Sequence, residues 1–229
     1  YSMIADDIVI FDDDSDDGSR ELINACSKAM IRKPMTVGID EGERMDCYYE
    51  IKRESFDFDW VIFPDIDEFI VAPNGLRETI DRDGKNFNVL CSSGFNMVGD
   101  NLPVDDGRQI YDIHSIGVHA PVYSKPIVVK PSATISWHWG RHQVNAGSDP
   151  VCHGNMKLLH YRYMGYNDTE ERNERNYKRS SDKGAAWSCA PGHTGEHSAK
   201  WAVESKQHGF NVMEHTSCSE CDRYYQGKQ

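Results

Sequence analysis

Long apolar runs and a surplus of basic residues are both missing from this sequence. No stretch approaches the roughly 18–20 apolar residues of a membrane-spanning helix, so we expect no membrane span in this chain. Lys and Arg number 25 against 37 Asp and Glu, which gives a formal net charge of −12. Nucleic acids normally require a basic surface, so we expect no nucleic-acid partner. A phosphate-bearing ligand stays open, because a bound divalent metal can supply positive charge.

The cysteines do not form the regular set that a disulfide framework requires. There are seven of them, an odd and scattered set: Cys26, Cys47, Cys91, Cys152, Cys189, Cys218 and Cys221. Together with the lack of a visible signal peptide, they predict a cytoplasmic location, either free or at the cytoplasmic face of a membrane. Near the C-terminus His215, Cys218 and Cys221 have the spacing of zinc ligands. A second cysteine pair is missing, so zinc stays open.

Apolar runs and helical patterns alternate in the first 98 of the 229 residues. We expect strands at 8–11, 35–39, 59–71 and 87–98, and helices at 18–30, 41–56 and 76–84. This alternation predicts an α/β domain with a mainly parallel central sheet flanked by helices. Prolines at 121, 126 and 131 predict a smaller part with antiparallel or hairpin strands in the C-terminal half. A polar helix is expected at 167–183.

The stretch "DIVIFDDDSDDGS" (7–19) places aspartates directly behind an apolar strand. An EF-hand calcium loop that began at Asp13 would need Glu at its twelfth position, where Asn24 stands. A solvated turn before a helix explains Asp16 or Asp17, because carboxylates are favourable near a helix N-terminus. It does not explain Asp12 and Asp13, which follow the strand at the end where open α/β sheets bind ligands.

A second apolar run ends in carboxylates in "DWVIFPDIDEFI" (59–70). In an extended segment, residues i and i+2 point to the same side. We therefore expect Asp65 and Asp67 to face one point beyond the strand. Two carboxylates there suit Mg²⁺ or Mn²⁺, which take carboxylates, waters and substrate phosphates.

Both acidic segments resemble those of a known enzyme family. "IVIFDDDSDDGS" resembles the "vvDDgSxDgt" segment of GT-A-fold glycosyltransferases of the family 2 type. "DWVIFPDIDEFI" resembles the "dWvlflDiDEFi" segment of the branch with the family 92-like and the viral or bacterial capsular enzymes. "YSKPIVVKP", "SWHWGRH" and "MKLLHYR" are similar to later segments of that branch, so the resemblance covers roughly residues 5–165.

The resemblance implies a GT-A-like single domain and a metal-dependent glycosyltransferase. A donor half (1–98) would bind a UDP-, GDP- or dTDP-sugar, an acceptor-side half (99–180) would bind a glycan, and a His/Cys-rich extension (181–229) would follow. By the same resemblance, Asp12, Asp13 and Arg44 would contact the donor. Asp65 would contact the donor as well, and Asp65 and Asp67 would hold the metal at the diphosphate. Members of the family begin with a strand and a helix before the first acidic motif, so the donor base stays open here.

An inverting transferase also needs a general base that deprotonates the acceptor hydroxyl. Asp100 follows the strand at 87–98 and is our first choice, with Asp105, Asp106 and His142 as alternatives. His160 or His142 could complete the metal shell, because imidazole readily binds transition metals, and we assign His160 to it. Trp137, Trp139 and Tyr161 are candidates for stacking on a sugar ring or for core packing.

Two other functions remain compatible with the sequence. A nucleotidyltransferase on a related sheet would carry a glycine-rich phosphate loop near its start, and none is visible. An inactive transferase-like domain or a divalent-cation-dependent carbohydrate-binding module would carry the same acidic segments without turnover.

Overall fold

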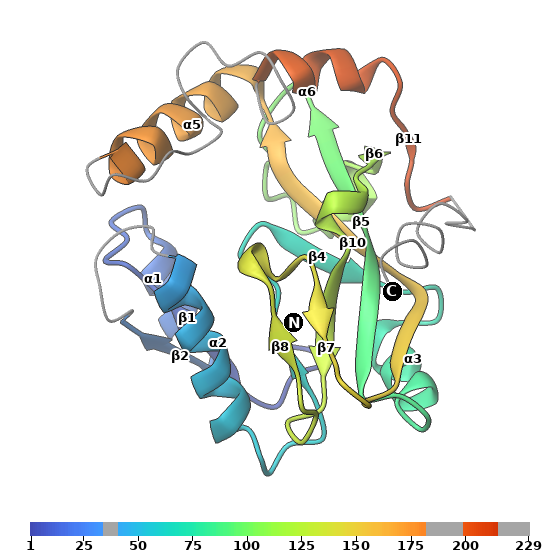
Figure 1. Cartoon of the computed structure of the whole chain (residues 1–229). Coiled ribbons are helices and arrows are strands. Elements are labelled where there is room, and N and C mark those ends of the chain that lie inside the picture. Colours follow the sequence, from blue (N-terminus) through green and yellow to red (C-terminus); the bar gives the residue numbers. More distant parts are fainter. Residues whose placement is uncertain (34–40, 182–198, 215–229) are drawn as a thin grey trace.

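A computed structural model describes residues 1–33, 41–181 and 199–214. In chain order (Figure 1) the elements are β1 (Ile8–Phe11), α1 (Ser19–Asn24), β2 (Ala29–Arg32), α2 (Glu41–Glu54), β3 (Val61–Ile62), β4 (Glu68–Val71), α3 (Leu76–Asp83), β5 (Val89–Gly99), α4 (Ile110–Ile113), β6 (Ile116–His119), η1 (Pro121–Tyr123), β7 (Lys125–Val129), β8 (Ser136–Trp137), η2 (Trp139–Arg141), β9 (Val144–Asn145), β10 (Val151–Met164), α5 (Tyr166–Ser181), α6 (Ala199–Lys206) and β11 (Phe210–Asn211). Within these residues, no helix is both long enough and apolar enough to cross a membrane.

The long strand β5 is the centre of a seven-stranded sheet. On one side it pairs in parallel with β10. On its other side it pairs antiparallel with β7 near its start and with β6 further along. The outer strands β4, β3 and β11 are antiparallel to β10, β7 and β6 respectively. The sheet is therefore mostly antiparallel, and the predicted central parallel sheet flanked by helices is wrong.

The error has a local cause in the segment that we expected to be one strand, 59–71. Pro64 lacks the N–H that a strand donates, and the chain turns directly after it. The segment is thus divided into β3, which pairs with β7, and β4, which pairs with β10.

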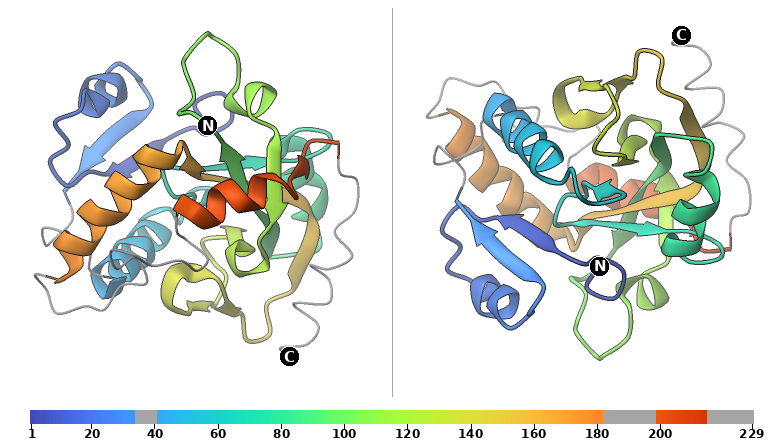
Figure 2. Two further views of the ribbon diagram at one scale, coloured as in Figure 1. Left: turned by 90° about the horizontal axis from the view of Figure 1, so that it is seen from above. Right: turned by 90° about the horizontal axis from the view of Figure 1, so that it is seen from below.

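A second cause lies in β1 and β2, which form a separate two-stranded parallel sheet in the described part of the chain. Figure 2 shows β1, β2 and α1 to one side of the large sheet in both views. The strand at 8–11 is confirmed. The helix expected at 18–30 ends at Asn24, and the strand expected at 35–39 lies outside the described residues.

Most other elements follow their local patterns. The helices expected at 41–56 and 76–84 are α2 and α3, and the strand expected at 87–98 is β5. The polar helix at 167–183 is α5, whereas α6 was not expected. Pro126 does not mark an edge strand, because β7 pairs with β3 on one side and with β5 on the other.

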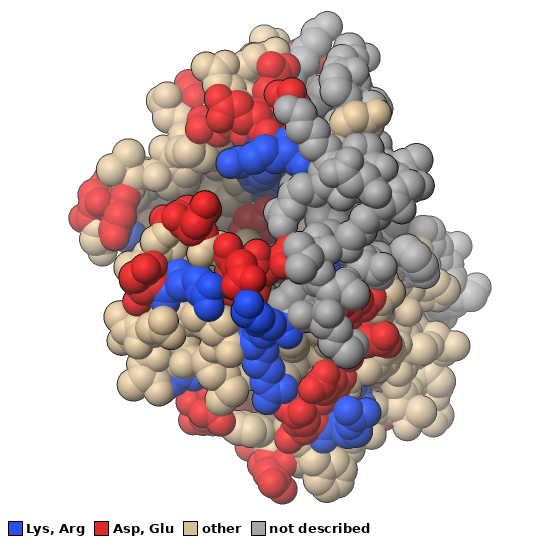
Figure 3. All heavy atoms as spheres, turned by 90° about the vertical axis from the view of Figure 1, so that its left-hand side faces the viewer, with Lys and Arg blue, Asp and Glu red and all other residues tan. Residues whose placement is uncertain are grey.

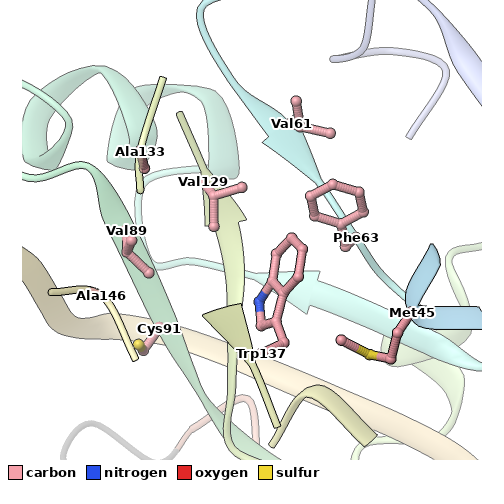
Figure 4. Packing of buried hydrophobic residues seen from close by; sticks show 9 residues of the cluster. All are labelled: Met45, Val61, Phe63, Val89, Cys91, Val129, Ala133, Trp137 and Ala146. Atoms are coloured by element: carbon pink, nitrogen blue, oxygen red, sulfur yellow. The ribbon is translucent and has the colours of Figure 1, made fainter. Parts of the chain in front are cut away.

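The core packs against both faces of the large sheet, because successive residues of β5 point to opposite faces. Val89 and Cys91 belong to a cluster that α2 covers through Met45, and Figure 4 shows Trp137 near Phe63 in this cluster. Leu90 belongs to a second cluster with residues of α3, β7 and β10. A third cluster surrounds the far half of β5 and β10.

Candidate active site

The acidic segment after β3 is a tight turn rather than an extended strand end. The Glu68 amide donates to the Asp65 carbonyl at 3.0 Å, and the Asp65 amide donates to Glu68 Oε2 at 2.9 Å. Ile66, in the middle of the turn, is 87% exposed. The extended geometry that we expected for this segment is therefore wrong. Asp65 and Asp67 are near each other, but their carboxylates have different partners.

The carboxylate of Asp65 lies among fixed cations. Lys125 Nζ is 2.8 Å from Oδ2, and Arg141 Nη2 is 2.6 Å from Oδ1. Arg44 from α2 is 3.2 Å from Oδ1, and the Tyr48 hydroxyl donates to the same atom at 3.1 Å. Burial disfavours the charged form of Asp65, but these cations outweigh burial and hold its pKa well below the usual range.

Lys125 connects this carboxylate to a second one. Its side chain is only 3% exposed, and Nζ lies 2.5 Å from Oε1 of Glu68, whose side chain is fully buried. Burial alone would lower the pKa of Lys125, but Asp65 and Glu68 together raise it. Lys125 is therefore held in its charged form between two carboxylates, and this ion pair network is part of the folded core.

Arg141 reaches Asp65 from a strained backbone position. Its φ is 57°, in the left-handed region, and it follows Gly140 at 70°. Such a conformation costs a non-glycine residue about 1 kcal/mol or more. The guanidinium compensates with contacts: it donates to the Phe63 carbonyl, and its Cζ lies 4.0 Å from the centre of the Tyr48 ring. Strain of this kind often marks a functional site.

Asp67 has a more open environment than Asp65. Its side chain is 32% exposed, and its carbonyl accepts the Tyr161 amide of β10 at 2.8 Å. Oδ2 lies 3.6 Å from His160 Nε2. Burial raises the pKa of Asp67, but the neighbouring His160 imidazole and Arg162 contribute to a net lowering. Asp67 is thus an ionised carboxylate with access to solvent.

The imidazole of His160 is held from several directions. Its Nδ1 lies 2.8 Å from Asn96 Oδ1 on the neighbouring strand β5, and the side chain is 6% exposed. The Tyr123 ring is centred 4.4 Å from it. Tyr123 can approach because β5 has glycine at position 94, where a Cβ would lie 2.4 Å from the Tyr123 carbonyl carbon. Gly94 therefore allows η1 to pack directly over β5.

His142 lies beside this cluster. Its ring is centred 5.5 Å from that of Tyr123, and its Nδ1 has no hydrogen-bond partner among the described residues. Burial first, and Lys125 second, lower the pKa of His142 to about 4. His142 is therefore neutral at physiological pH.

Basic residues of β10 and α5 also lie near Asp67. Arg162 donates to Asn173 Oδ1 at 3.2 Å, which fixes it against α5. Burial and the charge of Arg162 lower the pKa of Arg172, while Asp67 opposes this shift. Figure 3 shows the side on which α2 and α5 lie, with a hollow that has acidic atoms on its floor and basic side chains at its rims.

Other predicted site residues lie away from this cluster. Asp100 directly follows β5, is 72% exposed and pairs with Lys206. It is four residues beyond Asn96, which corresponds to about 13 Å at ~3.3 Å per residue.

Asp12 is buried in the loop after β1, where it accepts the Ser15 amide and lies 3.5 Å from Arg20. Asp13 follows it in the same loop. Asp105 and Asp106 bond to nearby loop residues.

Two of the three candidate stacking residues belong to the core. Trp137 packs in the α2-side cluster and is 7% exposed. Tyr161 packs in the third cluster, and its hydroxyl donates to the His114 carbonyl. The side chain of Trp139 lies outside the described part, as do His215, Cys218 and Cys221. In the described ranges no group of three or more His, Cys, Asp and Glu is placed to hold a metal.

The sequence reasoning missed Lys125, Arg141 and Asn96 as site residues. A signal existed for Lys125, the polar residue in the otherwise apolar strand β7, and for Asn96, which stands between the apolar residues Phe95 and Met97 of β5. Such a residue is buried only with a partner. Arg141 stands directly before His142, but nothing local in the sequence points it toward Asp65, 76 positions earlier.

A cavity of about 420 Å³ lies elsewhere, between the end of α2, α3 and the end of β7. Trp60 and Lys130 line it, and the ammonium of Lys130 lies over the Trp60 ring at 5.1 Å. None of the predicted site residues lines this cavity. We place the site at Asp65 and Asp67 because buried ionisable groups converge there, which is a stronger functional signal than volume.

A scan against protein-family models and a search of curated proteins found no match.

Proposed function

We propose that this chain is a metal-dependent glycosyltransferase that moves a sugar from a nucleoside-diphosphate sugar to a glycan acceptor with inversion. The observation that carries the proposal is the pair formed by the partly exposed Asp67 carboxylate and the buried His160 imidazole, beside the cation-rich Asp65 network. An ionised carboxylate and an imidazole in one place are ligands that Mn²⁺ accepts. The resemblance of the two acidic segments to those of family 2-type transferases supports the same activity.

The residues present fit a divalent ion at Asp67 and His160. Asp65 is the third predicted ligand, but both of its oxygens already accept bonds from cationic donors. We therefore assign Asp65 mainly to holding Lys125 and Arg141 in place. Bound Mn²⁺ or Mg²⁺ would supply Lewis acidity toward the leaving diphosphate.

The chain's own residues would position the donor. Arg44 on α2 is 41% exposed and reaches Asp65 from the rim, so it can also meet a phosphate. Arg162 and Arg172 offer further positive charge near Asp67. Asp12 and Asp13 keep the donor-binding role that the resemblance implies.

The general base stays a proposal with two candidates. His142 lies within the cluster and is neutral at physiological pH, so it can accept a proton. A base with a pKa of about 4 is weaker than one near 7. Asp100 would need a movement of the end of β5 to reach the cluster.

The weakness of His142 as a base favours a second candidate function, that of a divalent-cation-dependent carbohydrate-binding module. Such a module would bind a sugar through the same Asp67 and His160 pair without turnover. Only transfer or hydrolysis of a donor sugar separates the two.

Isothermal titration tests the proposal. UDP, GDP and dTDP are titrated with Mn²⁺, with Mg²⁺ and with EDTA into the wild type, Asp67→Asn and the exposed control Asp106→Asn. We expect one nucleotide to bind only with metal, and Asp67→Asn to weaken that binding at least tenfold, about 1.4 kcal/mol. If no nucleotide binds with either metal, the transferase proposal fails. A nucleotide-binding chain is then incubated with the matching sugar donors, and release of the nucleoside diphosphate distinguishes the enzyme from the module.

A further inference from the structure

Asn96 is a fully buried polar residue of β5, and its side-chain oxygen contacts His160. Its Oδ1 lies 2.8 Å from His160 Nδ1. An amide oxygen can only accept, so in this arrangement Nδ1 carries the hydrogen. The neutral imidazole then has its lone pair on Nε2, the atom nearest to Asp67.

The reverse arrangement is less favourable. If the Asn96 amide turned by half a rotation, Nδ2 would donate to Nδ1 and the hydrogen would move to Nε2. That hydrogen would then have to bond to Asp67 Oδ2, but the two atoms are 3.6 Å apart, beyond hydrogen-bond distance. The observed spacing instead leaves two acceptor atoms, Oδ2 and Nε2, side by side.

The ring cannot easily turn to exchange its nitrogens. The Tyr123 ring is centred 4.4 Å from it and tilted by 33°, and Tyr163 meets it edge-on at 5.9 Å. The two tyrosine hydroxyls are 3.4 Å apart and close this aromatic enclosure. The orientation of Nε2 is therefore set by its packing, and the position of the hydrogen is set by Asn96.

We propose that Asn96 is a positioning residue that fixes His160 in the Nδ1–H form, so that Nε2 and Asp67 Oδ2 present their lone pairs to one divalent cation. This rests on the metal site of the proposed function. Hydrogen bonds of this kind from the second nitrogen of a ligand histidine orient the ring and raise its basicity. In this orientation of the amide, Nδ2 of Asn96 is buried without a hydrogen-bond partner among the described residues, which destabilises the folded chain.

The test uses the metal-free chain and ¹⁵N–¹H correlation spectra of its histidine rings at a pH where they are neutral. We expect the Nδ1–H form for His160 in the wild type. Asn96→Asp keeps an acceptor and should keep that form, whereas Asn96→Leu removes the acceptor and should lose it. Asn101→Leu, in an exposed position, is the control. The Nε2–H form in the wild type would overturn the proposal without any variant.

Titration with Mn²⁺ alone gives a second readout. Asn96→Leu should weaken Mn²⁺ binding about 10- to 100-fold, the usual loss for such a residue, and Asn96→Asp should not. Unchanged affinity in Asn96→Leu would contradict the proposal. If Asn96→Leu does not fold, a folded Asn96→Asp with lost affinity would contradict it as well.

The two proposals fail separately. If no nucleotide binds but the Nδ1–H form and Mn²⁺ affinity depend on position 96, the transferase proposal fails and the role of Asn96 stands. If a nucleotide binds with metal but the hydrogen is on Nε2, only the role of Asn96 fails.

Discussion

Asp65 and Asp67 are two residues apart in one turn, yet their environments differ sharply. Asp65 shares its two oxygens among Lys125, Arg141, Arg44 and Tyr48. Asp67 has an imidazole 3.6 Å away and an open side toward solvent. The difference indicates that the two carboxylates have different roles: Asp65 stabilises the fold of the site, while Asp67 is available to a ligand.

The largest expected effect comes from Asp65→Ala. The change leaves Lys125 and Arg141 without a shared counter-charge, and breaking a buried ion pair costs about 3–5 kcal/mol. Asp67→Ala removes a partly exposed carboxylate and should cost less than about 1 kcal/mol. Urea unfolding at pH 7 measures both. Equal losses would contradict the division between the two carboxylates.

The next effect concerns His142, which lies beside the Asp65 network. Its pKa is about 4 in the folded chain and about 6.5 when unfolded. Between these values the unfolded chain binds a proton that the folded chain does not. Stability should therefore fall as the pH drops from about 6.5 toward 4, by at most about 3 kcal/mol from this group. His142→Gln should flatten the pH dependence of urea unfolding in that window, and the exposed His138→Gln should not. An unchanged profile in His142→Gln would show that His142 is not the group responsible.

The variant Arg172→Gln tests whether the basic residues near Asp67 contribute to nucleotide binding. Removal of one charged donor should weaken metal-dependent nucleotide binding roughly five- to tenfold and reduce its salt dependence. Stability should hold or rise slightly, since Arg172 and Arg162 repel each other. Titration calorimetry at two salt concentrations gives the result, with Arg108→Gln as the control. A loss of stability with unchanged affinity would place Arg172 in the fold alone.

The smallest effect is expected for Asp100→Asn. Its ion pair with Lys206 is exposed, and such pairs contribute little, so stability should change by less than about 0.5 kcal/mol. Donor turnover should also stay unchanged if the chemistry is confined to the cluster at Asp67. A hundredfold loss of turnover would restore Asp100 as the base and show that the end of β5 moves during the reaction.

Local patterns in the sequence were sufficient for single elements. The apolar runs at 8–11 and 87–98 form β1 and β5, and Gly84 follows α3 as expected. The sheet could not be predicted in the same way, because strand pairing depends on distant segments. The one local warning was Pro64, which separates β3 from β4.

The same limit applies to the site. Arg44, His142 and His160 were selected from the sequence, and the structure places Arg44 and His142 near Asp65 and His160 beside Asp67. The partners that neutralise Asp65 come from positions 60 and 76 residues away. Their contribution depends on how β7 and η2 pack against the turn. Spacing in the sequence carries no information on that packing.

In the described part of the chain β4 is an edge strand, and the side chain of Tyr1 bonds to its backbone. The Tyr1 hydroxyl accepts the Ile70 amide at 3.0 Å and donates to the Glu68 carbonyl at 3.2 Å. Burial raises the pKa of Tyr1, so the hydroxyl keeps its hydrogen. A single side chain can leave this edge without unfolding the sheet. The deuterium exchange rate of the Ile70 amide should therefore report how often Tyr1 detaches from the strand that begins at the acidic turn.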